Sequence, residues 1–172
     1  IRDCSVAVQN RTILLVGPMG VGKTTIGKKL AKRLELPFID TDQRIVSEHG
    51  EISEIFEKQG EKEFRRIEEE VLAEVVKESA VISTGGGAVL SQRNQDLMKQ
   101  ATVVYLATDG KHIASRLSKG KRPLLKNGFS DWKEIYAARK PIYLEVATIV
   151  VDTSKQGLRA TIEEICEKLE RL

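Results

Sequence analysis

The feature that most constrains this chain is a short apolar run followed at once by a glycine-rich loop and a helical pattern. Residues 12–16 read TILLV and residues 17–24 read GPMGVGKT, which matches the pattern G-x-x-x-x-G-K-[ST] between a strand and a helix. The glycines let backbone N–H groups converge on phosphate oxygens. The alternative is a glycine-rich turn with a chance Lys-Thr pair. The segment predicts a nucleotide-phosphate site, formed by Gly20, Val21, Gly22, Lys23, Thr24 and Thr25.

Short apolar runs alternate with amphipathic stretches along the rest of the chain, a pattern typical of a parallel sheet covered by helices. We predict strands at residues 12–16, 37–40, 80–84, 102–107 and 148–152. We predict helices at residues 23–34, 41–49, 61–77, 91–99, 131–145 and 161–172. The length of 172 residues suits one domain. The expected fold is therefore a single α/β domain over residues 1–172, with helices on both sides of a parallel sheet.

The charges are unevenly placed along the chain. The net charge is +3, but residues 111–130 hold six cations and no acid, so the remainder is net negative. This argues against a globally basic nucleic-acid binder and favours a local site for an anion. An ordinary solvated basic loop is the alternative. Residues 119–130 have weak periodicity, two glycines and a proline, which predicts a long loop of the kind that forms lids.

Composition limits the cellular context. Two cysteines are too few for a disulfide framework, so a reducing compartment such as the cytoplasm is expected, with Cys166 in the core. No apolar run approaches the roughly 20 residues that span a bilayer, so no membrane association is expected. Residues 1–10 carry no functional expectation. Trp132, His49 and His112 are predicted to be surface or helix-end residues.

Two aspartates directly follow the second predicted strand, as Asp40-Thr41-Asp42. The carboxyl ends of strands in an open parallel sheet face the binding crevice, so we expect both carboxylates there. One could hold Mg²⁺ or its water while the other accepts a proton from a substrate hydroxyl. The alternative is that Asp42 or Thr41 only caps the next helix. Ser83 lies near the end of the third predicted strand, where any metal contact would pass through water.

An arginine and a glycine run complete the candidate acceptor side. Arg65 lies beside the buried stripe of its predicted helix. It could be held by Glu68 and aimed at a substrate carboxylate, or it could belong to a surface ion-pair lattice with neighbouring glutamates. Residues 85–87 are three consecutive glycines, which close approach of a ligand would explain. A plain turn is the alternative.

Together these elements resemble the shikimate kinase family. The resemblance covers about residues 12–154 and rests on motifs in the family's order and spacing: GPMGVGKT, Asp40-x-Asp42, Gly60-Glu-x-x-Phe64-Arg65, Gly85-Gly-Gly87, Arg122-Pro-Leu-Leu125 and Arg139-x-x-x-Tyr143. It implies a P-loop kinase fold of the nucleoside-monophosphate-kinase type, with a five-stranded parallel sheet and a mobile lid at about residues 119–130. It implies transfer of the γ-phosphate of ATP to the 3-hydroxyl of shikimate, a step of chorismate and aromatic amino-acid biosynthesis. We expect a Mg²⁺-dependent cytoplasmic enzyme, acting as a monomer.

The resemblance also implies the catalytic and metal roles. Lys23 would reach the phosphates, Asp42 would act on the shikimate hydroxyl, and Arg122 would be the lid arginine that reaches the phosphates. Thr24 and Asp40 would hold Mg²⁺.

The implied shikimate-binding residues are Asp42, Arg65, Gly86, Gly87 and Arg139. The two arginines would grip the carboxylate, while Phe56 and Phe64 would lie near the ring or simply in the core. Nucleotide contacts beyond the glycine-rich loop would come from Arg116, Arg122 and Gln156. Arg116 would lie near adenine, with an exposed helix cation as the alternative.

Two other functions remain open at the level of sequence. Another small-metabolite kinase of this fold, such as a gluconate kinase, also binds a carboxylate with hydroxyls. A non-catalytic nucleotide-dependent switch would keep the fold without an acceptor pocket. The aspartate pair and the glycine run, in this order, favour shikimate.

Overall fold

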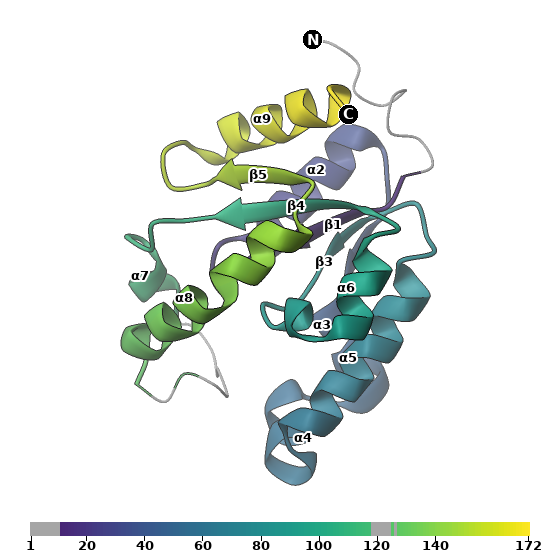
Figure 1. Cartoon of the computed structure of the whole chain (residues 1–172), viewed down its shortest axis with the longest axis vertical. Helices are drawn as coiled ribbons and strands as arrows, with labels where there is room; N and C mark the ends of the chain where they lie inside the picture. Colours follow the sequence, from purple (N-terminus) through teal and green to yellow (C-terminus); the bar gives the residue numbers. More distant parts are fainter. Residues whose placement is uncertain (1–10, 118–124, 126) are drawn as a thin grey trace.

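A five-stranded parallel sheet forms the centre of the fold (Figure 1). The computed structural model describes residues 11–117, 125 and 127–172. The strand order is β2-β3-β1-β4-β5, and every neighbouring pair is parallel. The strands are β1 (Ile13–Val16), β2 (Phe38–Asp40), β3 (Val81–Ser83), β4 (Thr102–Ala107) and β5 (Ile149–Asp152). The predicted parallel sheet is confirmed, and each predicted strand end lies within one residue of the observed one.

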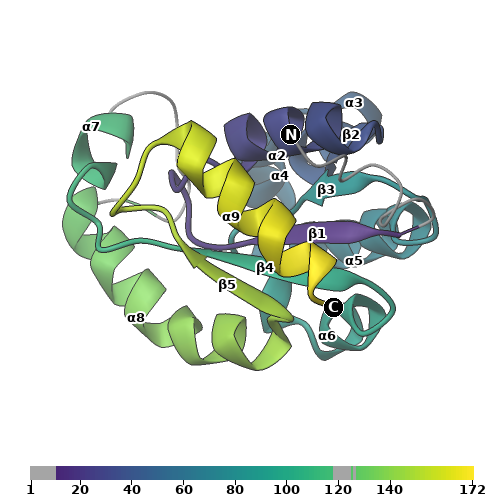
Figure 2. The same ribbon diagram turned by 90° about the horizontal axis from the view of Figure 1, so that it is seen from above.

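Helices cover both faces of the sheet and give the predicted three layers. α2 (Lys23–Leu34) and α9 (Leu158–Glu170) pack on one face, as Figures 1 and 2 show. The other face carries α3 (Thr41–His49), α5 (Glu61–Val75), α6 (Gln92–Met98) and α8 (Phe129–Val146). Two buried apolar clusters, one on each side of the sheet, correspond to these layers. The inner strands β1 and β3 are buried on both faces, as their Ile- and Val-rich sequences predict.

Three short elements were not predicted: α4 (Ile52–Gln59), α7 (Ile113–Leu117) and the 3₁₀ helix η1 (Ala88–Leu90). Each is too short to show several turns of helical periodicity. In addition, α8 begins at Phe129 rather than at residue 131, so the end of the predicted long loop is helical. The rest of that loop, with Arg122, lies largely outside the described residues. No helix in the described ranges is long and apolar enough to cross a membrane.

Trp132 lies in the first turn of α8, in agreement with the predicted helix-end position, but it is not a surface residue. Its side chain is only 3% exposed, and its ring stacks on Phe129 and meets Tyr136 edge-on. The predictions for Cys166 and the two histidines are confirmed, since Cys166 is buried while His49 and His112 are exposed. The buried indole lies beside the glycine-rich loop, because its N–H donates to the carbonyl oxygen of Met19.

Candidate active site

The loop between β1 and α2 is built to receive an anion. Gly22, with φ 104°, precedes α2 and offers no side-chain cap, and the first helical turn contains no acid. The N–H groups at the start of α2 therefore have no side-chain acceptor, and the helix end carries partial positive charge. A Cβ at Gly17 would lie 2.6 Å from the carbonyl oxygen of Leu106. Only glycine fits where the loop passes this close to β4.

Lys23 lies folded over the same loop. Its Nζ donates hydrogen bonds to the carbonyl oxygens of Gly17 at 2.7 Å and Pro18 at 2.9 Å. Its ammonium group is therefore held at the loop that the sequence assigns to phosphates.

Arg116, on α7, also reaches the loop. Its Nη1 donates to the carbonyl oxygens of Gly20 at 2.9 Å and Val21 at 3.3 Å. The side chain of Val21 is 2% exposed, so only its backbone can face a nucleotide. Arg116 is thus exposed, as one alternative had it, but it is also bound to the loop.

Gln156 is not brought to this loop. Its Nε2 donates to Oε1 of Glu164 at 2.9 Å and weakly to the carbonyl oxygen of Asp152 at 3.4 Å. It lines a separate shallow groove along α9. In this structure Gln156 therefore contacts α9 and not the glycine-rich loop where it was predicted to bind the nucleotide.

Asp40, the last residue of β2, accepts hydrogen bonds from the first turns of α2 and α3. Its Oδ2 accepts from the Thr24 hydroxyl at 3.0 Å. Its Oδ1 accepts from the N–H groups of Asp42 at 2.9 Å and Gln43 at 3.2 Å, which makes Asp40 the N-cap of α3. The alternative that Asp42 or Thr41 is this cap was wrong. The side chain of Asp42 is therefore not used to start the helix.

Two adjoining cavities lie at the carboxyl ends of the strands. The smaller, about 220 Å³, is the phosphate cavity; its lining includes Gly20, Gly22, Lys23, Thr24, Thr25, Asp40, Ser83 and Thr84. The larger, about 430 Å³, is the acceptor cavity; its lining includes Phe56, Phe64, Arg65, Glu68, Gly87 and Arg139. Met19, Asp42, Gly85 and Gly86 line both. Groups bound in the two cavities would therefore meet at this shared wall.

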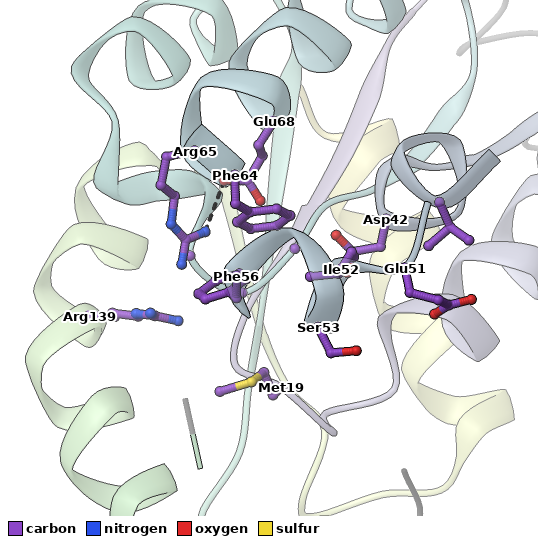
Figure 3. A pocket seen from close by; sticks show the side chains of 14 residues that line it. Met19, Asp42, Glu51, Ile52, Ser53, Phe56, Phe64, Arg65, Glu68 and Arg139 are labelled. Carbon is purple, nitrogen blue, oxygen red and sulfur yellow. Dashed lines mark hydrogen bonds and ion pairs between the residues drawn. The ribbon is translucent and has the colours of Figure 1, made fainter. Parts of the chain in front are cut away.

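Positive and negative side chains lie on opposite sides of the acceptor cavity. Figure 3 places the guanidinium groups of Arg65 and Arg139 on one side and Asp42 on the other. Arg139 is 7% exposed, so both its charge and its hydrogen-bond donors are largely withdrawn from water. A buried guanidinium group and a partly buried one at one cavity wall are suited to a carboxylate.

Arg65 is held by acids on its own helix. Its Nη1 donates to Glu68 Oε1 at 3.0 Å, and its Nη2 donates to Glu61 Oε1 at 3.3 Å. The predicted support from Glu68 is present. Since the side chain of Arg65 is only 17% exposed and lines the cavity, its pair with Glu68 is part of the cavity wall. The ion pair with the half-exposed Glu61, which the lattice alternative named, is also present.

Glu68 is an almost completely buried acid, 2% exposed. Burial raises its pKa to about 7, although the adjacent Arg65 guanidinium opposes that shift. The nearby Asp42 adds to the rise, because two like charges disfavour each other. Glu68 therefore titrates close to neutral pH.

Two of the three consecutive glycines are explained by the chain's own side chains. A Cβ at Gly85 would lie 2.9 Å from Glu68 Oε2 and 3.0 Å from Asp42 Oδ1. A Cβ at Gly87 would lie 2.6 Å from Arg65 Cζ. Close approach does require these two glycines, but the groups that approach are the chain's own cavity side chains, whereas the prediction was approach of a ligand.

The glycine run is tied to α8 by Tyr143. This residue is fully buried, and its hydroxyl donates to the carbonyl oxygen of Gly86. Burial raises the pKa of Tyr143 to about 12, so the hydroxyl keeps its proton and remains a donor. α8 thus carries both Arg139 and the residue that fixes the neighbouring loop.

Sequence reasoning missed the wall formed by α3 and α4. Val46, Glu51, Ile52 and Ser53 line the acceptor cavity, but none was singled out. The available signal was a short segment bracketed by Gly50 and Gly60 with apolar residues at helical spacing. Trp132 was missed because its partner is a backbone carbonyl 113 positions away.

Comparison with known proteins identifies the family. A family model described as shikimate kinase matches residues 19–170. The shikimate kinase of Chromohalobacter salexigens is 41% identical over 94% of this chain and 93% of its own length. The solved structure of the Acinetobacter baumannii shikimate kinase in complex with shikimate has a TM-score of 0.91 and 36% identity, covering 98% of this chain and 97% of that one.

A gluconokinase from Sinorhizobium meliloti is similar in fold only, with 17% identity, a TM-score of 0.57, and coverage of 94% of this chain and 92% of that one. The similarity to shikimate kinases extends over nearly the whole chain and includes both the phosphate loop and the acceptor cavity. The chain belongs to the shikimate kinase family.

Proposed function

We propose that the acceptor cavity binds shikimate, with its carboxylate on Arg65 and Arg139 and its hydroxyls toward Asp42, Gly86 and Gly87. The observation that carries this proposal is the polarity of the cavity: two guanidinium groups face Asp42 across it (Figure 3). A planar guanidinium can bind a carboxylate through two parallel hydrogen bonds. This arrangement would turn the 3-hydroxyl toward the wall shared with the phosphate cavity.

Asp42 is the proposed catalytic carboxylate. It lines both cavities, so it can hold a hydroxyl of the acceptor beside the phosphate to be transferred. In a loose phosphoryl-transfer transition state, catalysis depends mainly on positioning and on neutralising charge. Asp42 would orient the 3-hydroxyl and accept its proton as the new P–O bond forms, while the bond from the γ-phosphorus to the ADP oxygen breaks.

Lys23 and the backbone donors of the loop would stabilise the phosphates of ATP. Lys23 now donates to two loop carbonyls, and it would exchange at least one of them for a phosphate oxygen. Arg116, Arg122 and Gln156 are the further nucleotide contacts that we propose, and Arg122 would neutralise the transferring group from the lid. Arg122 lies outside the described residues, and Gln156 would have to leave Glu164 to reach the nucleotide.

The oxygen ligands at the floor of the phosphate cavity fit Mg²⁺. Thr24 Oγ1 and Asp40 Oδ2 lie 3.0 Å apart, and Mg²⁺ commonly binds through one or two protein oxygens, substrate phosphates and water. The described residues contain no cluster of three or more His, Cys, Asp or Glu side chains suited to a metal, so the ion would depend on ATP. When bound, Mg²⁺ would neutralise charge on the phosphates.

Cellular context and assembly follow as parts of the same proposal. A buried free Cys166 and a chain with only two cysteines suit a reducing compartment, and we propose the cytoplasm. Every residue assigned to the site belongs to one chain, so a monomer would suffice for activity.

The test of the proposed function is the substitution Asp42→Asn, which keeps the shape of the side chain and removes its charge and basicity. We expect kcat with shikimate to fall by roughly 100-fold or more, the scale of losing a general base. The affinity for ADP, measured by calorimetry, should stay within about threefold because the loop is intact.

Glu48→Gln provides a matched control, since it removes one acidic charge from the same helix outside both cavities. Its kcat should remain close to that of the wild type. Near wild-type turnover by Asp42→Asn would show that Asp42 does not act on the acceptor hydroxyl, and the proposed mechanism would fail.

A further inference from the structure

The glycine-rich loop is held from behind by a residue that the phosphate pattern does not include. The indole Nε1 of Trp132 donates to the carbonyl oxygen of Met19 at 2.7 Å. Met19 is the third residue of the loop and lines both cavities. Trp132 lies in the first turn of α8 and is 3% exposed, so the donor side of this bond is shielded from water.

The carbonyl of Met19 and the N–H of Gly20 belong to one peptide group. A trans peptide is planar, so its C=O and N–H point in opposite directions. A donor that fixes the carbonyl on one side of the loop therefore fixes the direction of the N–H on the other side. Gly20 lines the phosphate cavity, and no backbone carbonyl in the described ranges accepts its N–H.

The orientation of this peptide needs an external restraint. Gly20 has φ +80°, and a Cβ there would meet only side-chain atoms at 3.7 Å or more. Glycine is the residue with the widest choice of backbone conformations, so local sterics alone do not fix the plane. Trp132 supplies a restraint on Met19, and Arg116 supplies a similar one on the next carbonyl, that of Gly20.

The indole itself is held firmly. It stacks on Phe129 with ring centroids 5.5 Å apart and meets Tyr136 edge-on at 5.2 Å. A Cβ at Gly110 would come within 3.0 Å of the indole ring, so this neighbouring turn also packs closely against it. The position of the N–H is therefore set by the packing of α8 rather than by the loop it contacts.

We infer that Trp132 is a positioning residue for the nucleotide: its indole N–H orients the Met19–Gly20 peptide so that the Gly20 N–H faces the phosphates. This inference rests on the proposed nucleotide site and adds a residue to it. Removing the indole N–H would weaken phosphate binding without removing any group that touches the nucleotide. Shikimate binding, which depends on Arg65 and Arg139, would be spared.

The sharpest test exploits the single tryptophan of the chain. Growth of a tryptophan-requiring host on benzothienylalanine would replace only this indole with a ring of nearly the same shape whose sulfur cannot donate. Isothermal titration with ADP in the presence of Mg²⁺ should show about tenfold weaker binding, within the range expected for losing one hydrogen bond to a charged group. Shikimate affinity and Tm should stay close to the wild type.

Three controls separate orientation from packing. Replacement by 7-azatryptophan, which retains the N–H, should leave ADP affinity within twofold. Phe129→Leu removes the stacked ring but leaves the donor and the edge-on contact with Tyr136, so its loss of ADP affinity should be clearly smaller than that of the benzothiophene protein. Trp132→Phe, made by ordinary mutagenesis, should show the ADP defect, so the test does not depend on the analogue.

Two results would overturn the inference. If the benzothiophene protein binds ADP within twofold of the wild type, the indole N–H does not orient the Met19–Gly20 peptide for phosphate binding. An equal loss of ADP and shikimate affinity with a lowered Tm would make Trp132 a packing residue. Because ADP binding is measured without an acceptor, these outcomes are independent of whether the wild type phosphorylates shikimate.

Discussion

A methyl group at position 87 would strike the guanidinium group that is proposed to hold the substrate carboxylate. The Cβ of Gly87→Ala would lie 2.6 Å from Arg65 Cζ, whereas non-bonded carbon atoms pack at about 3.5–4.0 Å. The guanidinium group must therefore move by about 1 Å. Because it is the end of a flexible side chain, it can move, but it would leave its place beside Glu68, now 3.0 Å away.

The expected cost falls on substrate binding rather than on folding. A charge-assisted hydrogen bond contributes about 1.5–3 kcal/mol, and displacing a positioning group by about 1 Å can cost about 100-fold. We therefore expect Gly87→Ala to raise the Kd and KM for shikimate by roughly 10- to 100-fold. Gly87 has φ −97° and ψ 4°, a conformation open to alanine, so Tm should change by only a few degrees.

Calorimetric titration with shikimate and steady-state kinetics measure this effect, and a double-mutant cycle locates it. In an Arg65→Ala background the added methyl group meets no guanidinium. Gly87→Ala should therefore weaken shikimate binding little further. Gly157→Ala is the matched control, since a Cβ there meets nothing within 4 Å. Wild-type binding by Gly87→Ala, or an equal loss with and without Arg65, would show that the methyl group does not act through the Arg65 guanidinium.

Two further predictions concern the same arginine and its buried partner. Arg65→Lys keeps the charge but loses the planar fork, so shikimate affinity should fall about 10- to 100-fold while the affinity for shikimate carboxamide barely changes; equal losses for both ligands would contradict the assignment. Burial raises the pKa of Glu68 to about 7, so this residue should contribute stability that is complete below pH 4.5 and lost as the pH rises through 7, about 3 kcal/mol in all. The Tm of the wild type relative to Glu68→Gln should therefore fall between pH 5 and pH 8, and a constant difference would contradict the pKa shift.

Elements specified by adjacent residues were predicted well. The start of α2 at Lys23 and of α3 at Thr41 were predicted to the residue, because glycine, aspartate and strand-ending patterns mark them locally. The pairing of Arg65 with Glu68 was also foreseen, since residues three apart lie on one face of a helix. Each of these features is determined by residues only a few positions away in the sequence.

Features that depend on distant partners were not predicted. No residue near Trp132 in the sequence indicates that it is buried. Its hydrogen-bond partner, the carbonyl oxygen of Met19, lies in a distant part of the chain. The alternative that Asp42 or Thr41 capped α3 failed because the carboxylate of Asp40, at the strand end, reaches the same N–H groups. Gln156 was expected at the nucleotide, but its side chain donates to Glu164 on α9 instead.

The glycine run at residues 85–87 shows an intermediate case. Its composition predicted close approach of a ligand at this point, and the structure shows close approach of the chain's own side chains. The sequence could not show that Asp42, Glu68 and Arg65 would be among the approaching groups, because they lie on two helices that meet only in the folded protein. Tyr143 adds a hydrogen bond to the same run from a third helix.

We propose that the acceptor cavity selects shikimate and that phosphate goes to its 3-hydroxyl. Both points are measured by incubating the protein with ATP and Mg²⁺ together with shikimate, gluconate or a nucleoside monophosphate as the sole acceptor. ADP release and ³¹P NMR of the product are then followed. We expect stoichiometric shikimate 3-phosphate, and kcat/KM for gluconate or a nucleoside monophosphate lower by at least about 1,000-fold, which corresponds to about 4 kcal/mol of discrimination. Comparable turnover of gluconate would show that the cavity does not select shikimate, and ADP release without a phosphorylated shikimate would show that the 3-hydroxyl is not the acceptor.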